Sequence, residues 1–396
     1  MIKRQQVKEQ TSKWAGDLIS IRRYLHAHPE LSFNEENTAQ YISSLLDEWG
    51  ISYTKGIAGH GISGLIKGKN HHKKVVALRA DIDALPIYEK NNIPYKSKNK
   101  GVMHACGHDV HTTCLLGTIK FLNLNKDNFE GSVKFIFQPA EEKLPGGAIQ
   151  MIKAGILKNP VPDVMIGQHV FPDLEVGKVG FRAGMYMASA DEINLYIRGK
   201  GGHAAMPEKI DDTVLGMAEI ISSLQKIVSR KAPPSVPTVL SFGKVVADGA
   251  HNVIPSEVIV QGTFRTFDEI WRKKAHYLIS NMAKNVAASQ GLECEVKIDK
   301  GYPFLKNDPL VTQVVRDAAE EFLGKNNVVE LPIRMTAEDF ASFAQLIPSS
   351  FYRLGTANKN KGIVNGLHTP NFNVDEKSIE IGTGLMIWNT LKLLLI

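Results

Sequence analysis

The chain has 396 residues, of which 43% are hydrophobic and 22% charged, and this balance excludes a disordered or fibrous protein. At about 150 residues per domain, the length predicts two to three domains with a large buried core. The 47 lysines and arginines exceed the 41 acidic residues by only six and are scattered, so nothing indicates a nucleic-acid-binding surface.

The cysteines and the two ends of the chain bear on its location. Three cysteines, Cys106, Cys114 and Cys294, are too few for a disulfide framework, and their odd number is typical of a reducing compartment. The N-terminus is polar and lacks the apolar segment of a signal peptide. The apolar stretch 385–396 is interrupted by polar residues and is shorter than the roughly 20 residues that span a bilayer. We expect a cytoplasmic protein with a buried C-terminal helix and no membrane partner.

The first 183 residues alternate between helical and strand patterns. Apolar residues at steps close to 3.6 predict helices, and short apolar runs predict buried strands. The predicted helices cover 7–25, 35–48, 110–122 and 148–157, and the predicted strands cover 75–78, 133–137 and 164–166. Strands that alternate with helices indicate a mostly parallel sheet covered on both faces.

The pattern changes between residues 184 and 299. Its order β-α-β-β-α-β is that of a ferredoxin-like α+β sheet. The predicted strands cover 192–198, 239–246, 258–267 and 292–298, and the predicted helices cover 212–229 and 268–289. We therefore predict an α/β protein with a discontinuous main domain, 1–183 and 300–396. Residues 184–299 would form an inserted ferredoxin-like lid domain, with hinges near Gly184 and Gly301.

Residues with metal-binding side chains follow the predicted strands of the main domain. Ligands bind outside the carboxyl ends of the strands in open α/β sheets, so these positions should meet at one edge. Thiolate, imidazole and carboxylate groups are all ligands of divalent transition metals. The residues concerned are Asp81, Cys106, His108, Glu141, Glu142 and His169. Together they indicate a metal centre, although each alone is a weak signal.

The adjacent carboxylates Glu141 and Glu142 are expected to have different roles. Adjacent carboxylates repel each other, so a positive group is expected nearby. One of them can bind a metal while the other takes a proton from a metal-bound water, whose pKa falls from 15.7 to about 7. A positioned carboxylate base adds roughly 10²- to 10⁴-fold in rate.

The ordered motifs of the chain resemble a known family. They are Arg22 to Leu31, Met103 to His111, Gln138 to Glu142, His169, Gly199 to Ala205, Asn252 to Pro255 and His368 to Pro370. The chain resembles the aminoacylase/carboxypeptidase family of dinuclear metallohydrolases over nearly its whole length. It is most similar to the amidohydrolase branch, which includes hippurate hydrolases, N-acetyldiaminopimelate deacetylases and plant auxin-conjugate hydrolases.

The resemblance implies a role for each of these positions in a catalytic main domain. It implies that two divalent metal ions, Mn or Zn first and Co or Ni as alternatives, are held by Cys106, His108, Glu142, His169 and His368. Glu141 is then the general base. Other branches carry His-x-Asp at the first strand end, where this chain has Arg79-x-Asp81. We expect Asp81 to orient a ligand histidine, and His111 either to do the same or to pack structurally.

Three residues of the inserted domain complete the expected site. The resemblance implies that His203 polarises the substrate carbonyl, in its own subunit or in that of a partner. It implies that Arg265 binds the substrate carboxylate, a bidentate task suited to guanidinium, with Asn252 beside it. A homodimer through the inserted domain is expected.

These observations favour hydrolysis of N-acyl-amino acids, such as N-acetyl or N-benzoyl derivatives, to a carboxylate and an amino acid. A dipeptidase or carboxypeptidase on the same scaffold is the nearest alternative. A cysteine hydrolase using Cys106 with His108, and a non-catalytic ligand-binding module, are more remote. Cys114 and Cys294 are expected to be packed thiols, and Glu338-Asp339 to cap a helix N-terminus.

Overall fold

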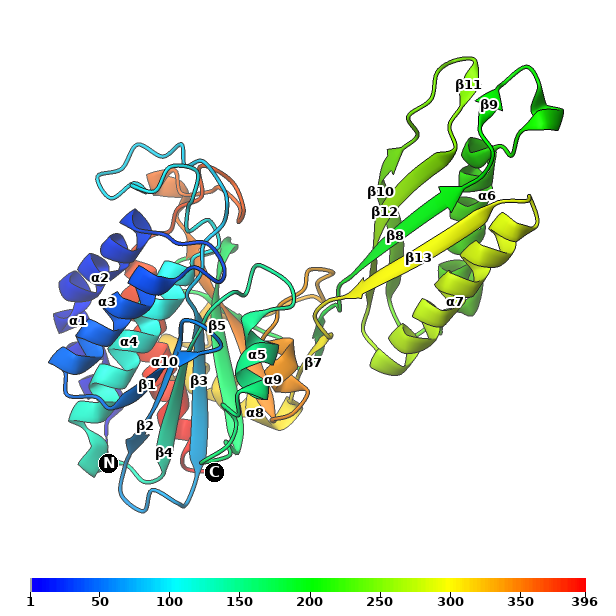
Figure 1. Ribbon diagram of the computed structural model, residues 1–396. Helices are drawn as coiled ribbons and strands as arrows, with labels where there is room; N and C mark the ends of the chain where they lie inside the picture. The colour runs from blue at the N-terminus through cyan, green and yellow to red at the C-terminus, as the bar shows by residue number, and fades with distance from the viewer. Residues whose placement is uncertain (1) are drawn as a thin grey trace. The chain divides into compact units, whose positions relative to one another are not determined.

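The computed structural model describes residues 2–396, which fold into two compact units. The first unit contains the chain up to Tyr186 together with Lys306–Ile333 and Asp339–Ile396. The second contains Met187–Leu305 and Arg334–Glu338. Figure 1 shows the elements of both units along the chain.

The first unit is built on an eight-stranded sheet in the order β1-β2-β4-β3-β5-β16-β6-β15. Its strands are β1 Tyr53–Ile57, β2 Gly61–Lys67, β3 Val75–Asp81, β4 Ser132–Gln138, β5 Val164–Glu175, β6 Val179–Phe181, β15 Val328–Glu330 and β16 Ser349–Ala357. The central strands β4, β3, β5 and β16 pair in parallel, as do β6 and β15. The predicted mostly parallel sheet is therefore confirmed.

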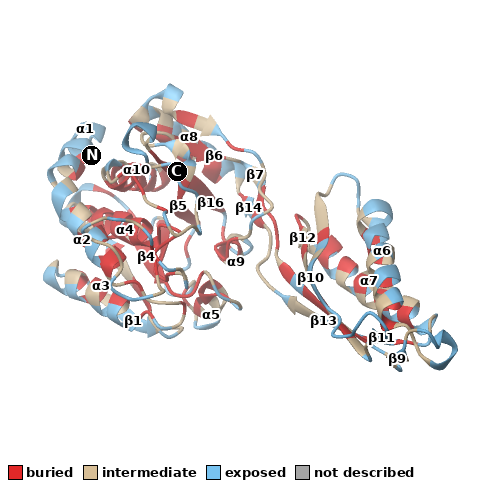
Figure 2. Ribbon diagram, turned by 90° about the horizontal axis from the view of Figure 1, so that it is seen from above, coloured by how far each residue is buried: buried red, intermediate tan, exposed pale blue. Residues whose placement is uncertain are grey.

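Helices cover both faces of this sheet, and its central strands are therefore buried, as their red colour in Figure 2 shows. The helices are α1 Arg4–Lys13, α2 Ala15–Ala27, α3 Glu36–Glu48, α4 His108–Leu124, α5 Gly147–Lys153, α8 Pro309–Leu323, α9 Ala341–Ala344 and α10 Lys377–Leu393. Helices α1, α2, α4, α8 and α10 pack around the main core, whereas α5 and α9 contact each other and rest on β4 and β16. Every residue of β3 and β4 is buried, as expected for strands covered on both faces.

Two helices differ from the sequence prediction. The predicted helix 7–25 is divided at Trp14, so that α1 packs on α10 while α2 packs on α4. Helix α5 ends at Lys153, four residues before the predicted end. Gly155 takes a φ of +86°, which ends the helix.

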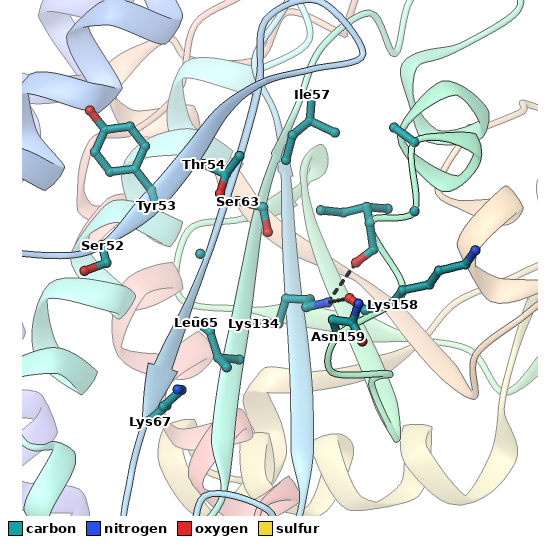
Figure 3. Close-up of a pocket in the computed structure, with 14 residues that line it drawn as sticks. Ser52, Tyr53, Thr54, Ile57, Ser63, Leu65, Lys67, Lys134, Lys158 and Asn159 are labelled. Carbon is teal, nitrogen blue, oxygen red and sulfur yellow. Dashed lines mark hydrogen bonds between the residues drawn. The ribbon is translucent and has the colours of Figure 1, made fainter.

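The segment after α5 is held by a buried lysine instead of helical hydrogen bonds. Lys134 Nζ on β4 donates to the carbonyl oxygens of Ile156, Lys158 and Pro160, each at 2.8 Å. Figure 3 shows Lys134 pointing toward the segment that contains Lys158. Burial lowers the pKa of Lys134 to about 8. The carbonyls that a longer helix would have used are therefore satisfied by this ammonium.

The second unit is a four-stranded antiparallel sheet with two long helices. Its strands are β8 Asp191–Arg198, β10 Thr238–Val246, β12 Glu257–Thr266 and β13 Glu293–Lys300, in the order β10-β12-β8-β13, and its helices are α6 Thr213–Lys226 and α7 Glu269–Ala288. Short strands β9 Gly202–His203 and β11 Val253–Ile254 pair separately, and β7 Gly184–Met187 and β14 Leu305–Asn307 lie where the chain passes between the units. The unit has its own core, formed by residues of the sheet and of both helices.

The C-terminal stretch belongs to α10, which packs against α1, α4 and α8. The predicted buried terminal helix is thus confirmed. Within residues 2–396, no helix is both long enough and apolar enough to cross a bilayer.

Candidate metal centre and active site

Five of the predicted site residues of the first unit come together from separate segments. Cys106 precedes α4, His108 is the first residue of α4, His169 lies on β5, and Glu142 follows β4. The fifth residue, His368, adopts a left-handed backbone with a φ of +59°, and its amide donates to the Ala105 carbonyl at 2.9 Å.

Short distances connect the ligand atoms of these five side chains. Cys106 Sγ lies 3.4 Å from His169 Nε2, and Glu142 Oε1 lies 3.3 Å from His368 Nε2 and 3.8 Å from His108 Nε2. The ligand atoms of Cys106, His108 and His169 are all within 4.8 Å of one another, and so are those of Cys106, Glu142 and His368. The thiol therefore belongs to two overlapping groups, each able to hold an ion.

Two buried atoms in this cluster have no hydrogen-bond partner among the described residues. They are His108 Nε2 and Glu142 Oε1, which face each other. A buried polar atom left unpaired costs about 1–3 kcal/mol, so such atoms call for an explanation. A mixed sulfur, nitrogen and oxygen set around them fits a divalent transition metal. The residues present therefore fit a dinuclear metal centre.

The turn at Gly107 lets Cys106 and His108 approach the same point. Gly107 has a φ of +79°, which side chains other than glycine rarely adopt. A Cβ on Gly107 would lie 2.4 Å from Cγ2 of Val170, the residue that follows His169. Glycine is thus needed here both for the backbone angle and for the close contact between two segments of the site.

The carboxylate that orients His108 is Asp83, which the sequence analysis did not single out. His108 Nδ1 donates to Asp83 Oδ1 at 3.1 Å. The other oxygen, Asp83 Oδ2, accepts from Ser32 Oγ at 2.7 Å and from the Glu142 amide at 3.0 Å. Such a contact fixes the ring and leaves Nε2 for a metal. The signal in the sequence was a second aspartate two residues beyond Asp81, at the end of the same strand.

Asp81 orients His111, which has no ring nitrogen left for a metal. His111 Nδ1 donates to Asp81 Oδ1 at 2.5 Å, and its Nε2 accepts from the Val170 amide at 2.8 Å. Asp81 Oδ2 accepts from Arg79 Nη1 at 2.7 Å. His169 is held by its own strand, because its Nδ1 donates to the Val170 carbonyl at 2.7 Å and leaves Nε2 facing Cys106.

The electrostatics of the cluster call for a positive charge. Burial, and then the negative charges of Glu142 and Glu141, raise the pKa of the Cys106 thiol well above its usual value. Burial alone would lower the pKa of His108, but the charges and hydrogen bonds of Asp81, Asp83 and Glu142 raise it to about 10. A cation bound among these groups would offset the crowded carboxylates and stabilise the thiolate. A nucleophilic cysteine, by contrast, needs a low thiol pKa.

Glu141 is buried beside the cluster, next to a carboxylate from a distant part of the chain. A ligand atom of Glu141 lies within 4.8 Å of His108 and Glu142. The Asp339 amide donates to Glu141 Oε1 at 3.4 Å, and the Asp339 carboxylate accepts from Arg79 Nη2 at 2.8 Å. Tertiary packing alone brings Asp339 here, because it is far from β3 and β4 in the sequence.

The prediction that Glu338-Asp339 caps a helix N-terminus is confirmed for Asp339, but the helix is α5 and not the one that follows it in the sequence. Helix α9 begins after Phe340 and has no side-chain cap. Asp339 Oδ2 accepts instead from the amide of Ala148, in the first turn of α5, at 3.0 Å. The carboxylate thus satisfies the N-terminus of a different helix, one that the fold brings beside it.

The predicted residues of the second unit lie on two parts of that unit. His203 on β9 is exposed, pairs with Val253 on β11, and accepts from the Ala205 amide at Nδ1. Asn252 adjoins this pair, and its carbonyl accepts from the Ala204 amide at 3.0 Å. Arg265 lies on β12, where it donates from Nε to Thr263 Oγ1 at 3.0 Å and from Nη1 to the Met335 carbonyl at 3.4 Å.

The groove drawn in Figure 3 is separate from this chemistry. It has a volume of about 550 Å³ and is lined by residues of β1, β2, β4 and the segment after α5. None of the predicted site residues lines it.

Thiol, imidazole and carboxylate ligands lie together at the strand ends of this mostly parallel sheet, beside a further carboxylate. This arrangement defines a metal-dependent hydrolase. The chain belongs to the family described as Peptidase family M20/M25/M40, whose model matches residues 77–387. This agrees with the resemblance seen in the sequence motifs.

Individual relatives agree with this assignment. The chain is 43% identical over 299 residues to an N-acyl-L-amino acid amidohydrolase of Geobacillus stearothermophilus, covering 76% of this chain and 80% of the relative. It is 37% identical over 368 residues to thermostable carboxypeptidase 2 of Saccharolobus solfataricus, covering 92% of each. A solved structure of a Bacillus subtilis protein, described as a dinuclear metal binding peptidase, superposes with a TM-score of 0.83 at 35% identity. That match covers 97% of this chain and 99% of the other.

Proposed function

We propose that this protein is a metal-dependent amidohydrolase that cleaves N-acyl-amino acids, such as N-acetyl or N-benzoyl derivatives, to a carboxylate and a free amino acid. The observation that carries the proposal is the pair of buried atoms that make no hydrogen bond among the described residues, His108 Nε2 and Glu142 Oε1, beside Glu141. The name of the Geobacillus relative supports the choice of substrate class.

The proposed metal ligands are the five side chains of the cluster, Cys106, His108, Glu142, His169 and His368. Their mixed donor set suits two divalent ions, with Mn or Zn preferred and Co or Ni as alternatives. Divalent ions bound there would acidify water and polarise a carbonyl oxygen. Burial, and then the charge of Arg353, lower the pKa of His169, which favours the neutral imidazole that a metal ligand requires.

Glu141 is the proposed general base and acid. Its carboxylate takes a proton from the attacking water and later returns that proton to the leaving amine nitrogen. A carboxylate in this role contributes roughly 10²- to 10⁴-fold in rate. Its position supports the role, because it is buried with a carboxylate oxygen within 4.8 Å of ligand atoms of His108 and Glu142.

The second unit is proposed to bind the substrate. Arg265 would bind the carboxylate of the amino-acid half with Asn252 beside it, and His203 would donate to the carbonyl oxygen in its own subunit or in a partner's. Loss of one such donor typically costs about 10²- to 10³-fold in rate. We propose that residues 184–299 form a ferredoxin-like lid and homodimerisation domain, and that 1–183 and 300–396 form the catalytic domain.

The three free, buried cysteines support a reducing cytoplasmic location.

A carboxypeptidase or dipeptidase is the second candidate, supported by the name of the Saccharolobus relative. The two activities differ in whether the substrate's amine is blocked. A panel that pairs each N-acetyl-amino acid with the matching dipeptide separates them by kcat/KM.

The replacement Glu141→Gln tests the proposal, because it keeps the size of the side chain and removes the base. We expect kcat for N-acetyl- or N-benzoyl-amino acids, with Mn²⁺ or Zn²⁺ added, to fall by about 10²- to 10⁴-fold. Metal content by elemental analysis should stay at the wild-type level. Glu130→Gln, at an exposed site paired with Lys73, is the matched control. Undiminished turnover in the Glu141→Gln variant would overturn the assignment.

A further inference from the structure

The turn that carries Glu141 has an unusual backbone. Ala140, the residue before Glu141, has a φ of +52°, in the left-handed region that residues other than glycine rarely adopt. The turn is also closely packed, because a Cβ on Gly147 would lie 1.8 Å from the Pro139 carbonyl oxygen. Surrounding contacts must therefore hold Ala140 in this conformation.

Glu35 makes the contact that holds Ala140. Its side chain is fully buried, and Oε1 accepts from the Ala140 amide at 2.8 Å and from the Phe33 amide at 3.0 Å. Phe33 is itself left-handed, with a φ of +70°. One carboxylate oxygen thus ties two left-handed residues together, from segments far apart in the sequence.

Glu35 is not needed for the helix that it precedes. It occupies the N-cap position of α3, but its side chain makes no capping hydrogen bond. Glu30 does this instead, accepting from the amides of Asn37 at 3.2 Å and Thr38 at 2.8 Å. Glutamate is also not among the residues preferred as an N-cap. The placement of Glu35 is therefore explained by the turn before Glu141 and not by α3.

The amides on both sides of Glu141 are held by carboxylates. Glu35 accepts from Ala140, and Asp83 accepts from Glu142 at 3.0 Å. The remaining oxygen, Glu35 Oε2, is buried and has no hydrogen-bond partner among the described residues. Burial, and then the charge of Asp83, raise the pKa of Glu35 to about 7. A neutral Glu35 would carry its proton on Oε2 and keep Oε1 as the acceptor.

We propose that Glu35 is a positioning residue for Glu141: by holding the left-handed Ala140 peptide, it aims the Glu141 carboxylate at the reacting water. This rests on the proposed role of Glu141 as the general base. Glu35 touches neither the substrate nor the cluster of ligand atoms in this account. It acts through one backbone amide, and misplacement of a catalytic group by 1 Å can cost about 10²-fold in rate.

The test compares Glu35→Ala and Glu35→Gln with Glu30→Ala, in the full-length metal-loaded enzyme acting on an N-acetyl-amino acid. Glu35→Ala removes the acceptor, and we expect kcat to fall by about 10²-fold with KM nearly constant. Glu35→Gln keeps an acceptor oxygen at Oε1 and should retain most of kcat. Glu30→Ala disturbs the same segment through α3, and should lower the unfolding midpoint without lowering kcat.

Three results would overturn the inference: wild-type kcat in Glu35→Ala, an equal loss of kcat in Glu35→Gln, or an equal loss in Glu30→Ala. If Glu35→Ala does not fold, Glu35→Asp replaces it, since its shorter side chain withdraws the acceptor and should lower kcat while Glu35→Gln does not. Glu141→Gln is assayed in parallel. Full activity of that variant would refute the base itself, whereas its inactivity together with full activity of Glu35→Ala would refute only the positioning role.

Discussion

Gly107 offers a quantitative test of the metal centre, because an added methyl group there meets two separate penalties. The first is the backbone, since a φ of +79° costs an L-residue about 1–2 kcal/mol. The second is the contact with Val170. A Cβ at 2.4 Å from Val170 Cγ2 must retreat by about 1 Å to reach ordinary van der Waals distance.

Overpacking of this kind costs typically about 1–3 kcal/mol, so Gly107→Ala should destabilise the protein by about 2–5 kcal/mol in total. The displacement also separates the Cys106–His108 turn from the strand that carries His169. We therefore expect the affinity for Mn²⁺ or Zn²⁺ to fall by about 10- to 100-fold, the range seen when the support of a metal ligand is lost.

Gly101→Ala is the matched control. Gly101 has a φ of +81°, and an added Cβ there has no atom within 4 Å. It should therefore carry only the backbone cost, about 1–2 kcal/mol, and leave metal affinity unchanged. The assays are urea unfolding of the metal-free protein and titration calorimetry with Mn²⁺ or Zn²⁺.

A double-mutant cycle identifies the contact itself. Val170→Ala should cost less in the Gly107→Ala background than in the wild type, because it removes the atoms that the new methyl group meets. The reasoning is refuted if Gly107→Ala and Gly101→Ala are equally destabilised and bind metal equally well, or if the cycle shows no coupling.

Two further predictions concern carboxylates. Asp83→Ala removes the partner that orients His108, and calorimetry should show metal affinity reduced by about 10- to 100-fold; unchanged affinity would contradict this role. Burial would raise the pKa of Asp191, but hydrogen bonds from Arg272 and His276 outweigh it and lower the pKa to about 2. Because the unfolded value is about 3.9, this contribution of roughly 2–3 kcal/mol is present above that pH and is lost as the pH falls towards 2. In the wild type, the free energy of unfolding should therefore fall between pH 5 and pH 2. This fall should be smaller in Asp191→Asn, and an equal fall in both proteins would show that another group is responsible.

The parallel sheet and the clustering of the candidate metal ligands could be predicted from local patterns. The apolar runs at 75–78, 133–137 and 164–166 are strands, and the residues that follow or end them gather at one edge. This works because parallel strands present their carboxyl ends on the same side, so a place at a strand end suffices to put Glu142 and His169 at the same edge of the sheet.

The partner of each side chain could not be predicted in the same way. Asp81 was expected to orient a ligand histidine, yet its partner is His111, and Asp83 holds His108. Asp81 and Asp83 are two residues apart at one strand end. The alternation of side chains along a strand places both on the same face, so it does not tell which of them contacts His108. Their partners depend on how α4, which carries both histidines, packs on the sheet after the turn at Gly107.

The sequence by itself determined which chemical groups are available at the candidate site. The motifs give the residue types, and their positions after predicted strands place them at one edge of the sheet. Only the tertiary structure decided how those groups are held. Glu35, Asp83 and Asp339 reach the site from three distant segments, and each acts through hydrogen bonds a few ångströms long. Hydrogen bonds of that length depend on the packing of whole elements against one another, which hydropathy and spacing along the chain do not specify.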